Sequence, residues 1–450
     1  MLNFKTTTQK EIDELNKALS TNEFGQANID TATGGAAFIP QSLENTLKVL
    51  TYENHHLRLW NRIHKDKAYS TIEEFNVVDS YGEDLPTFMD EGLAGPDTTG
   101  NYERRFAKVK GLNTTRSVTN LMTLVTATED PVALETNSGI LHLLGQTERA
   151  LFYGDSSIGG DGREGAEWDG LFKQADEANV MDLRGKHFED THLNEAANIV
   201  QGNYGIATDI FLPLPVSKLF SEQYYPNQRA LMNVESGELT AGTTITKFNS
   251  MAGTLDIQPS LFMNRGIKEL NLTDKAMGVA PTTPTVTVAT DETEGLFDAG
   301  TYKYAIVAFS KEGKSDVINV DPVTSIKGQS VKLTIKNAEN QIVAPESFTI
   351  YRTENNGNKF YEIGRVGATS TEANGETVFI DKNENLPGTA DAIVGQFSPD
   401  ALVLKELAPM FKLDYALTGP RHRFGIFYYA TPTMYMPKRF VKVKNIKITE

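Results

Sequence analysis

The sequence predicts an α+β protein with an all-β segment inserted into its chain, and three observations lead to this fold class. A long amphipathic helix is predicted over residues 131–153. Helical and strand-like runs alternate between residues 190 and 275, which indicates a mixed core. From about residue 276 to about residue 395 the helical patterns stop, and short alternating runs follow one another as in a β-sandwich.

Composition limits the classes of protein to which the chain can belong. Its 450 residues are enough for two or three domains, and the lack of cysteine excludes disulfides and thiolate metal sites and fits a reducing cytoplasm. No apolar run approaches the roughly 18 residues of a membrane span, and the N-terminus lacks the apolar core of a secretory signal. The formal net charge of -16 argues against a surface that grips phosphates, although a container for nucleic acid can itself be acidic.

The first part of the chain predicts an arm followed by a helix. Residues 1–35 are polar and rich in turn residues, with one short amphipathic helix near "EIDELNKALS". From Phe38 the stretch "IPQSLENTLKVLTYENHHLRLWNRI" is typical of a helix, with Leu43, Leu47, Leu50 and Leu57 near one face.

Residues 68–120 predict a long β-hairpin. Two alternating runs, Ser70–Ser80 and Tyr102–Val118, flank a segment rich in Gly, Pro and Asp. Neither face of these runs is apolar enough to make a core, and a hairpin that stands alone is marginal in water. We therefore expect a partner to support it.

The helix over 131–153 is the most regular element of the sequence. Asp130 is a suitable N-cap, Pro131 stands at the first helical position, and Gly154 is a good C-terminal glycine. At ~1.5 Å per residue the helix is roughly 34 Å long, enough to be the spine of a domain. Leucines recur along one stripe of this helix at Leu134, Leu141, Leu144 and Leu151.

After this helix the stretch "GDSSIGGDGREGAEWDG" predicts a flexible glycine-rich connector. It has no Gly-Lys-Ser/Thr, so it lacks the signature of a phosphate-binding loop. Beyond it, "THLNEAANIVQGNYG" predicts a helix, "TDIFLPLP" a buried strand and "VSKLFSEQYY" a second helix. The end of the chain, after residue 396, is expected to return to helix and strand and to pack with the domain that precedes the insert.

The insert resembles a fibronectin type III or immunoglobulin-like sandwich. The stretch "GTYKYAIVA" places Tyr302, Tyr304, Ile306 and Ala308 on one face, as in the tyrosine strand of such modules. The pieces "VKLTI", "FTIYRT" and "TVFIDKNENLPGT" also match, but here they follow the tyrosine strand instead of preceding it. The order is that of a circular permutation, which brings the ends of the module together and suits insertion into a host domain.

The host sequence resembles the major capsid proteins of tailed bacteriophages, which have the Hong-Kong-97-type shell fold, and is closest in texture to those of large virulent phages of Gram-positive bacteria. The stretches "KAYSTIEEFNVVDSYG", "ERALFYGD", "EWDGLFKQADEANVMDLRG" and "HLNEAANIVQGNYGIATDIFLPLPVSKLF" carry the resemblance. It implies an N-terminal arm over 1–35 and a shell domain over 36–275 plus 396–450. Within that domain it implies an extended loop over about 68–120, a spine helix over about 131–153 and an axial domain over about 190–275. The insert takes 276–395.

The resemblance also implies function and partners. It implies a structural, non-enzymatic protein that is made in the host cytoplasm and self-assembles into the hexamers and pentamers of an icosahedral head. It implies a place in the virion around double-stranded DNA, without sequence-specific binding, with portal and decoration or minor capsid proteins as partners and no membrane. Two alternatives stay open: an encapsulin-like nanocompartment shell, and a carbohydrate-binding adhesin or enzyme with a fibronectin-like module.

No chemical site is predicted. The sequence has no HExxH motif, and "DKNENL" from Asp381 departs from a calcium loop because Leu386 stands where glycine is needed. We therefore expect no catalytic residue, cofactor or metal. The basic end, Lys438 to Lys447, alternates with apolar residues as a half-exposed strand does.

Charged residues on the hairpin and the spine helix are the candidate sites. Because the hairpin has no core of its own, its charges are predicted to form ion pairs between subunits, with ordinary solvated charge as the alternative. The predicted contact residues are Arg104, Arg105, Arg116 and Arg149, paired with Glu73, Glu74, Glu83 and Glu91.

Overall fold

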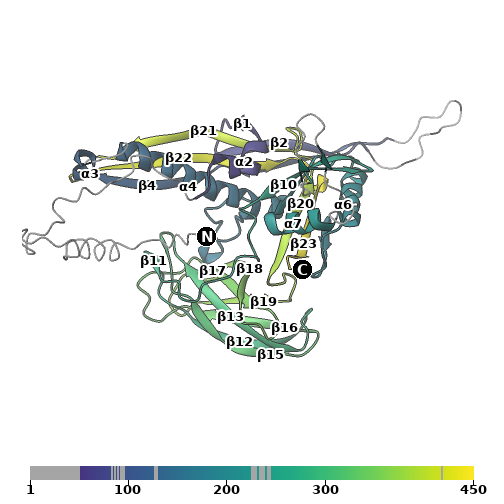
Figure 1. Ribbon diagram of the computed structural model, residues 1–450. Coiled ribbons are helices and arrows are strands. Elements are labelled where there is room, and N and C mark those ends of the chain that lie inside the picture. Colours follow the sequence, from purple (N-terminus) through teal and green to yellow (C-terminus); the bar gives the residue numbers. More distant parts are fainter. Residues whose placement is uncertain are drawn as a thin grey trace, which may run out of the picture.

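The computed structural model describes most of the chain after residue 50. The described residues are 51–82, 85, 88, 91, 97–125, 130–223, 231–232, 239–240, 245–416 and 419–449. They form a long four-stranded sheet backed by a helix, a six-stranded sheet flanked by helices, a projecting hairpin, and a β-sandwich that lies below them in Figure 1. The predicted arm over 1–35, and the helix predicted from Phe38 as far as residue 50, lie outside the described residues.

The four-stranded sheet joins segments that are far apart in sequence. Its order is β1-β21-β22-β4, with the bounds β1 His64–Lys67, β21 Leu402–Asp414, β22 Arg421–Met434 and β4 Lys110–Thr119. Helix α4, Pro131–Tyr153, packs on one face, and its N-cap carboxylate, Asp130, accepts a hydrogen bond from the Val132 N–H. Leu143 and Leu151 of α4 share a buried cluster with Ile426 and other residues of β22. The helix has the bounds that the sequence predicts.

The six-stranded sheet is covered on both faces. Its order is β5-β23-β20-β6-β10-β9, with the bounds β5 Val180–Asp182, β23 Phe440–Lys447, β20 Thr389–Gly395, β6 Asp209–Pro213, β10 Gly253–Ser260 and β9 Lys247–Ser250. Ile210 and Leu212 of β6 pack into one core with helices α6, Asp190–Gly202, and α7, Leu214–Gln223, whereas Phe211 packs into the core of α4. Burial on both faces explains why β6 is a continuous apolar run.

The predicted hairpin is shorter than the sequence suggests. Strand β2, Ile72–Ser80, pairs with β3, Asn101–Lys108, but the second predicted run does not continue in the hairpin to Val118. At Val109 the chain leaves the hairpin, and β4 pairs with β22 along its whole length. A period of two is the same in both sheets, so alternation alone could not reveal this change of partner.

Residues 277–381 form a two-layer β-sandwich. One layer has the order β11-β14-β13-β17-β18, with β15 also paired to β13, and the other has the order β12-β16-β19. Tyr302, Tyr304, Ile306 and Ala308 all lie in the core between the layers, as the alternation predicts. The strand bounds are β11 Met277–Gly278, β12 Thr285–Glu294, β13 Gly300–Phe309, β14 Gly313–Lys314, β15 Ile318–Ser325, β16 Gln329–Lys336, β17 Ser347–Thr353, β18 Phe360–Gly367 and β19 Glu376–Asp381.

The predicted end of the insert at residue 395 is too late. Strand β20, Thr389–Gly395, pairs with β6 and β23 in the six-stranded sheet, so the sandwich ends before it. The sequence pattern of β20 resembles that of a sandwich strand, because β20 is also largely buried. The Leu296 N–H donates to the Lys382 carbonyl, so the two sides of the cut lie together, as a circular permutation requires. That the sandwich is immunoglobulin-like stays a prediction.

The part of the predicted N-terminal helix that is described is broken. A 3-10 turn, Asn54–His56, is followed by the short helix α2, Arg58–Arg62, because Leu57 between them has a non-helical backbone. The region after residue 400 also differs from its prediction of helix and strand. Among the described residues its regular elements are strands β21, β22 and β23, apart from one 3-10 turn, Pro437–Arg439.

Candidate assembly surfaces

One face of the β2–β3 hairpin carries an apolar stripe. Cross-strand pairing places Ile72, Val78, Tyr102 and Phe106 on this face, because strand residues two apart point the same way. Their exposed fractions are 47%, 47%, 73% and 63% within the described part of the chain. Four large exposed apolar side chains on a two-stranded hairpin are typical of an interaction surface.

The opposite face holds the hairpin against the body. The Phe75 ring meets the Tyr435 ring edge to face, with centroids 4.9 Å apart. Farther along, Lys438 Nζ lies 3.1 Å from an Asp79 carboxylate oxygen. The hairpin thus has an attached face and an open face, and only the open face presents the apolar stripe.

The predicted contact residues of the hairpin already have partners in their own chain. The Arg104 guanidinium lies 3.3 Å from the Glu74 carboxylate, so these two are brought together, but across one hairpin. Arg105 lies 2.6 Å from Glu103, its neighbour two residues away. The Glu73 carboxylate accepts two backbone N–H groups at the start of β2. Contacts of these residues between subunits stay a prediction.

The other predicted contact residues are dispersed. Arg116 lies on β4 and reaches Glu135 of α4 at 3.7 Å. Arg149 lines a cleft beside the sandwich and forms no ion pair among the described residues. Glu91 stands exposed near the hairpin tip, and Glu83 lies outside the described residues. The structure does not gather these residues into one site.

Two further apolar surfaces gave no sequence signal. Helix α3, Asn120–Leu124, lies at the far left end of the four-stranded sheet in Figure 1, and Leu121, Leu124 and Val125 are exposed there. At the six-stranded sheet, Tyr204 is 91% exposed and Met251 92% exposed. Tyr204 also has a φ of 60°, a strained conformation for a residue with a side chain.

Two carboxylates hold α2 in the middle of the body. Glu148 of α4 is fully buried, and its two oxygens accept the N–H groups of Leu59 and Trp60 at 2.8 and 2.7 Å. Burial raises the pKa of Glu148 to about 7, against the smaller opposing effect of these hydrogen bonds. At the other end of α2, Arg62 donates two 2.9 Å hydrogen bonds to the buried Asp209 of β6. The contacts of Glu148 and Asp209 with α2 therefore set the position of β1, which follows α2.

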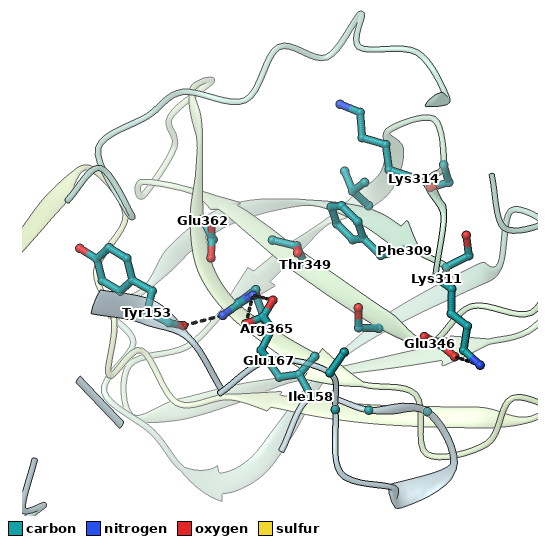
Figure 2. Close-up of a pocket in the computed structure, with 18 of the residues that line it drawn as sticks. Tyr153, Ile158, Glu167, Phe309, Lys311, Lys314, Glu346, Thr349, Glu362 and Arg365 are labelled. Carbon is teal, nitrogen blue, oxygen red and sulfur yellow. Dashed lines mark hydrogen bonds and ion pairs between the residues drawn. The ribbon is translucent and has the colours of Figure 1, made fainter. Parts of the chain in front are cut away.

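A cleft of about 1390 Å³ separates α4 from the sandwich. Figure 2 shows Tyr153 and Glu167 on the side of the body, and Phe309, Thr349, Glu362 and Lys314 on the side of the sandwich. Most of its charges are paired, for example Lys311 with Glu346 at 3.5 Å. In the described part of the chain no group of three or more His, Asp or Glu could hold a metal ion, and no helix there is long and apolar enough to cross a membrane.

These surfaces define a class of protein. The hairpin, the short helix α3 and the segments around Tyr204 and Met251 expose large apolar side chains, whereas the buried polar groups hold the body together. Exposed apolar surfaces of this kind are typical of a subunit of an assembly.

Comparisons with known proteins identify the family. The chain is 29% identical over 426 residues to the major capsid protein of Staphylococcus phage K, covering 93% of this chain and 92% of the relative. It is 30% identical over 431 residues to the putative major capsid protein of Enterococcus phage phiEF24C, with the same coverage. The chain therefore belongs to the major capsid proteins of bacteriophages, which are components of the virion. No family model matches it.

Solved structures also resemble the chain at low identity. A structure titled "Gordonia phage Cozz" has a TM-score of 0.49 and 11% identity, covering 94% of this chain and 96% of the other. The capsid of a native GTA particle has a TM-score of 0.48 and 9% identity, covering 94% and 100%. An encapsulin complex from Synechococcus elongatus has a TM-score of 0.44 and 10% identity, covering 94% and 98%. The family assignment rests on the sequence relatives.

Proposed function

We propose that this chain self-assembles into the hexamers and pentamers of an icosahedral phage head, and that the open face of the hairpin is its main contact with a neighbouring copy. The observation that carries the proposal is the apolar stripe of Ile72, Val78, Tyr102 and Phe106, which stays exposed although the reverse face of the hairpin is attached to the body.

The stripe is suited to a neighbour of the same kind. Burying an aromatic side chain contributes about 1.5–3 kcal/mol, and a shell repeats each contact at every subunit. The Arg104–Glu74 pair lies within the stripe and supplies polar groups that fix the register of the contact. Because both charges are half exposed or more, we assign the pair to orientation rather than to stability.

The role is structural rather than catalytic. The enclosed material is double-stranded DNA, held without reading its sequence, and a net charge of -16 suits enclosure without adhesion. Portal and decoration proteins are the expected partners at special positions of the shell.

The test replaces Tyr102 and Phe106 together by serine. We expect the double variant to stay folded and to raise the concentration needed for shell assembly by at least about a hundredfold, because two aromatic burials are lost at each contact. Sedimentation velocity and negative-stain microscopy measure the outcome. Ile342→Ser is the matched control, since Ile342 is 93% exposed on the sandwich. Shells of normal yield from the double variant refute the proposal.

A further inference from the structure

The glycine-rich stretch over 154–170 is a close-packed joint rather than a flexible connector. A Cβ on Gly159 would lie 2.1 Å from the Arg163 carbonyl oxygen, and one on Gly165 would lie 2.2 Å from the Ile158 carbonyl oxygen. Backbone approaches of this kind need glycine, so these residues permit packing instead of mobility. The joint therefore has a fixed shape, so an element that contacts it at one end is held in a fixed position relative to an element that contacts it at the other.

The sandwich grips this joint through an arginine. Arg365 of β18 donates from Nη1 to both carboxylate oxygens of Glu167, at 3.0 and 3.1 Å, and from Nη2 to the Tyr153 carbonyl at 2.6 Å (Figure 2). The Tyr153 carbonyl belongs to the last residue of α4, where unpaired carbonyls favour a cation. One side chain thus ties the sandwich to the joint and to the spine helix.

A second contact lies farther along the joint. The Asp161 carboxylate accepts the N–H and the hydroxyl of Thr371, both at 2.6 Å, and the Asp161 N–H donates to the Ala368 carbonyl at 2.9 Å. Next to it, Gly367 approaches Gly159 so closely that a Cβ on Gly367 would lie 2.5 Å from the Gly159 carbonyl oxygen. The sandwich and the joint are therefore in backbone contact.

The same joint holds the root of the hairpin. Lys110, at the start of β4, lies with its Nζ 2.7 Å from Glu164 Oε1 and donates to the Gly165 carbonyl at 2.9 Å. Lys108, at the end of β3, pairs with the same Glu164 carboxylate. These two lysines flank Val109, where the chain passes from the hairpin into the four-stranded sheet.

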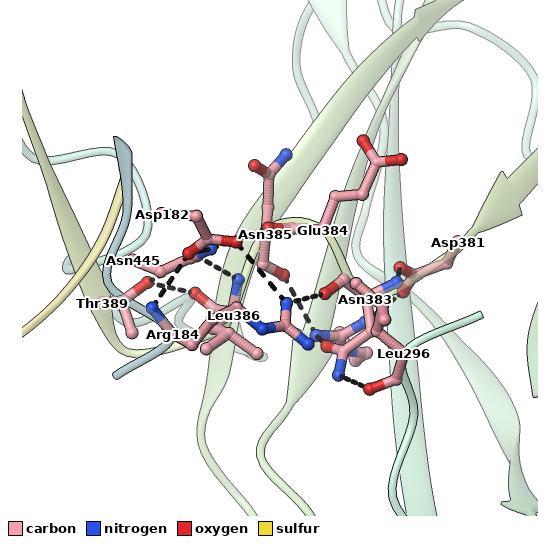
Figure 3. Close-up of polar contacts among 11 residues, drawn as sticks. Asp182, Arg184, Leu296, Asp381, Asn383, Glu384, Asn385, Leu386, Thr389 and Asn445 are labelled. Carbon is pink, nitrogen blue, oxygen red and sulfur yellow. Dashed lines mark hydrogen bonds and ion pairs between the residues drawn. The ribbon is translucent and has the colours of Figure 1, made fainter. Parts of the chain in front are cut away.

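The exit of the sandwich is also fixed to the body. Asn445 of β23 accepts the Leu386 N–H and donates to the Glu384 carbonyl, both at 2.8 Å, and Arg184 donates to the Asn383 carbonyl at 2.8 Å (Figure 3). With contacts at the joint and at the exit, the sandwich is held at two separate places and cannot swing on a single linker.

We propose that the inserted sandwich is an intramolecular brace: it fixes the joint over 154–170, and the joint, together with the contacts of Phe75 and Asp79, fixes the direction in which the hairpin leaves the body. The hairpin would then meet a neighbouring copy already oriented, which lowers the entropy lost on assembly. The value for assembly rests on the proposed function, but the brace itself is a property of the single chain.

The test measures hairpin direction in the unassembled protein. Because the chain has no cysteine, Asn101→Cys on the hairpin and Glu195→Cys on α6 give a unique pair of spin-label sites. Arg365→Met with Thr371→Val removes the side-chain hydrogen bonds of Arg365 and Thr371 to the joint. Glu164→Gln removes the ion pairs of the joint with Lys108 and Lys110. Lys332→Met with Thr287→Val, on exposed positions of the far sheet, is the matched control.

We expect a narrow distance distribution in the parent and the control and a broad one in both test variants. Amide exchange at residues 101–112 should become about tenfold faster or more when the charged hydrogen bonds are lost. An unchanged distribution in both variants overturns the brace. Broadening in Glu164→Gln alone also overturns it, because the joint would then hold the hairpin without the sandwich. Assembly at high concentration is scored separately, so failure of the shell contact does not mimic either result.

Discussion

Replacing Glu148 by glutamine tests how Glu148 holds α2, through the pH dependence of the unfolding free energy. Glu148 is fully buried, and burial raises its pKa from 4.5 to about 7. The folded chain therefore holds this proton more tightly than the unfolded chain does. The stability that the group contributes is fully present below about pH 4.5 and is lost as the pH rises through about 7.

The size of the effect follows from the shift. At 1.36 kcal/mol per pKa unit, the parent protein gains about 2–3 kcal/mol from this group between pH 8.5 and pH 5. Glutamine does not titrate, and it replaces one accepting oxygen by a donor that faces a backbone N–H, at a cost of about 1–3 kcal/mol at every pH. The parent-minus-variant difference in unfolding free energy should therefore widen in acid by about 2–3 kcal/mol.

The assay is denaturant unfolding of the unassembled chain at pH 5, 6, 7 and 8.5, followed by tryptophan fluorescence. Trp60 is a local reporter, since its backbone N–H donates to Glu148 at 2.7 Å. Subtracting the variant at each pH removes the titration of the other groups. A difference that stays constant from pH 5 to pH 8.5 would refute the reasoning.

Three other substitutions probe the body and the sandwich. Arg62→Met leaves Asp209 buried without its cation and should lower the unfolding free energy by about 3–5 kcal/mol, whereas Arg62→Lys should cost less in the same denaturation assay. Arg352→Met leaves the Asp381 carboxylate buried in the sandwich core without its cation. Amide hydrogen exchange at residues 300–309 should therefore accelerate while α4 stays protected. Equal acceleration in both regions would contradict a local effect. Gly159→Ala should destabilise by about 2–3 kcal/mol and Gly162→Ala by about 1 kcal/mol, because only the first lacks space for a Cβ; the reverse order of melting temperatures would count against the packed joint.

The sequence predicts correctly those helices and strands whose own residues carry a distinctive pattern. Helix α4 has a cap, a leading proline and a leucine stripe, so its bounds follow from the sequence. The tyrosine strand β13 also shows its buried face directly, because alternation and burial coincide. Where a pattern fits two structures the prediction fails. Strand β4 alternates like a hairpin strand but pairs with β22, more than 300 residues later in the chain.

The sites were harder to predict because their partners are distant or their signal is backbone geometry. Glu148 in α4 holds N–H groups of residues 59 and 60, and nothing near either position marks the pairing. Tyr204 has a φ of 60°, which the residue type does not predict. The glycines in 154–170 give the same sequence signal whether they provide backbone freedom or close approach, so the sequence alone predicts a flexible connector where the structure has a packed joint. The hairpin stripe gives a weak sequence signal, because Glu74 and Arg104 interrupt its apolar residues on the same face.

The order of strands in the six-stranded sheet also bears on how the protein is made. Its second and third strands, β23 and β20, come from residues 440–447 and 389–395, so the ribosome delivers them near the end of synthesis. A nascent or prematurely terminated chain can complete the sandwich over 277–381 while this sheet is still without its middle. A chain that stops before residue 389 lacks both strands that lie between β5 and β6, so it cannot form this sheet.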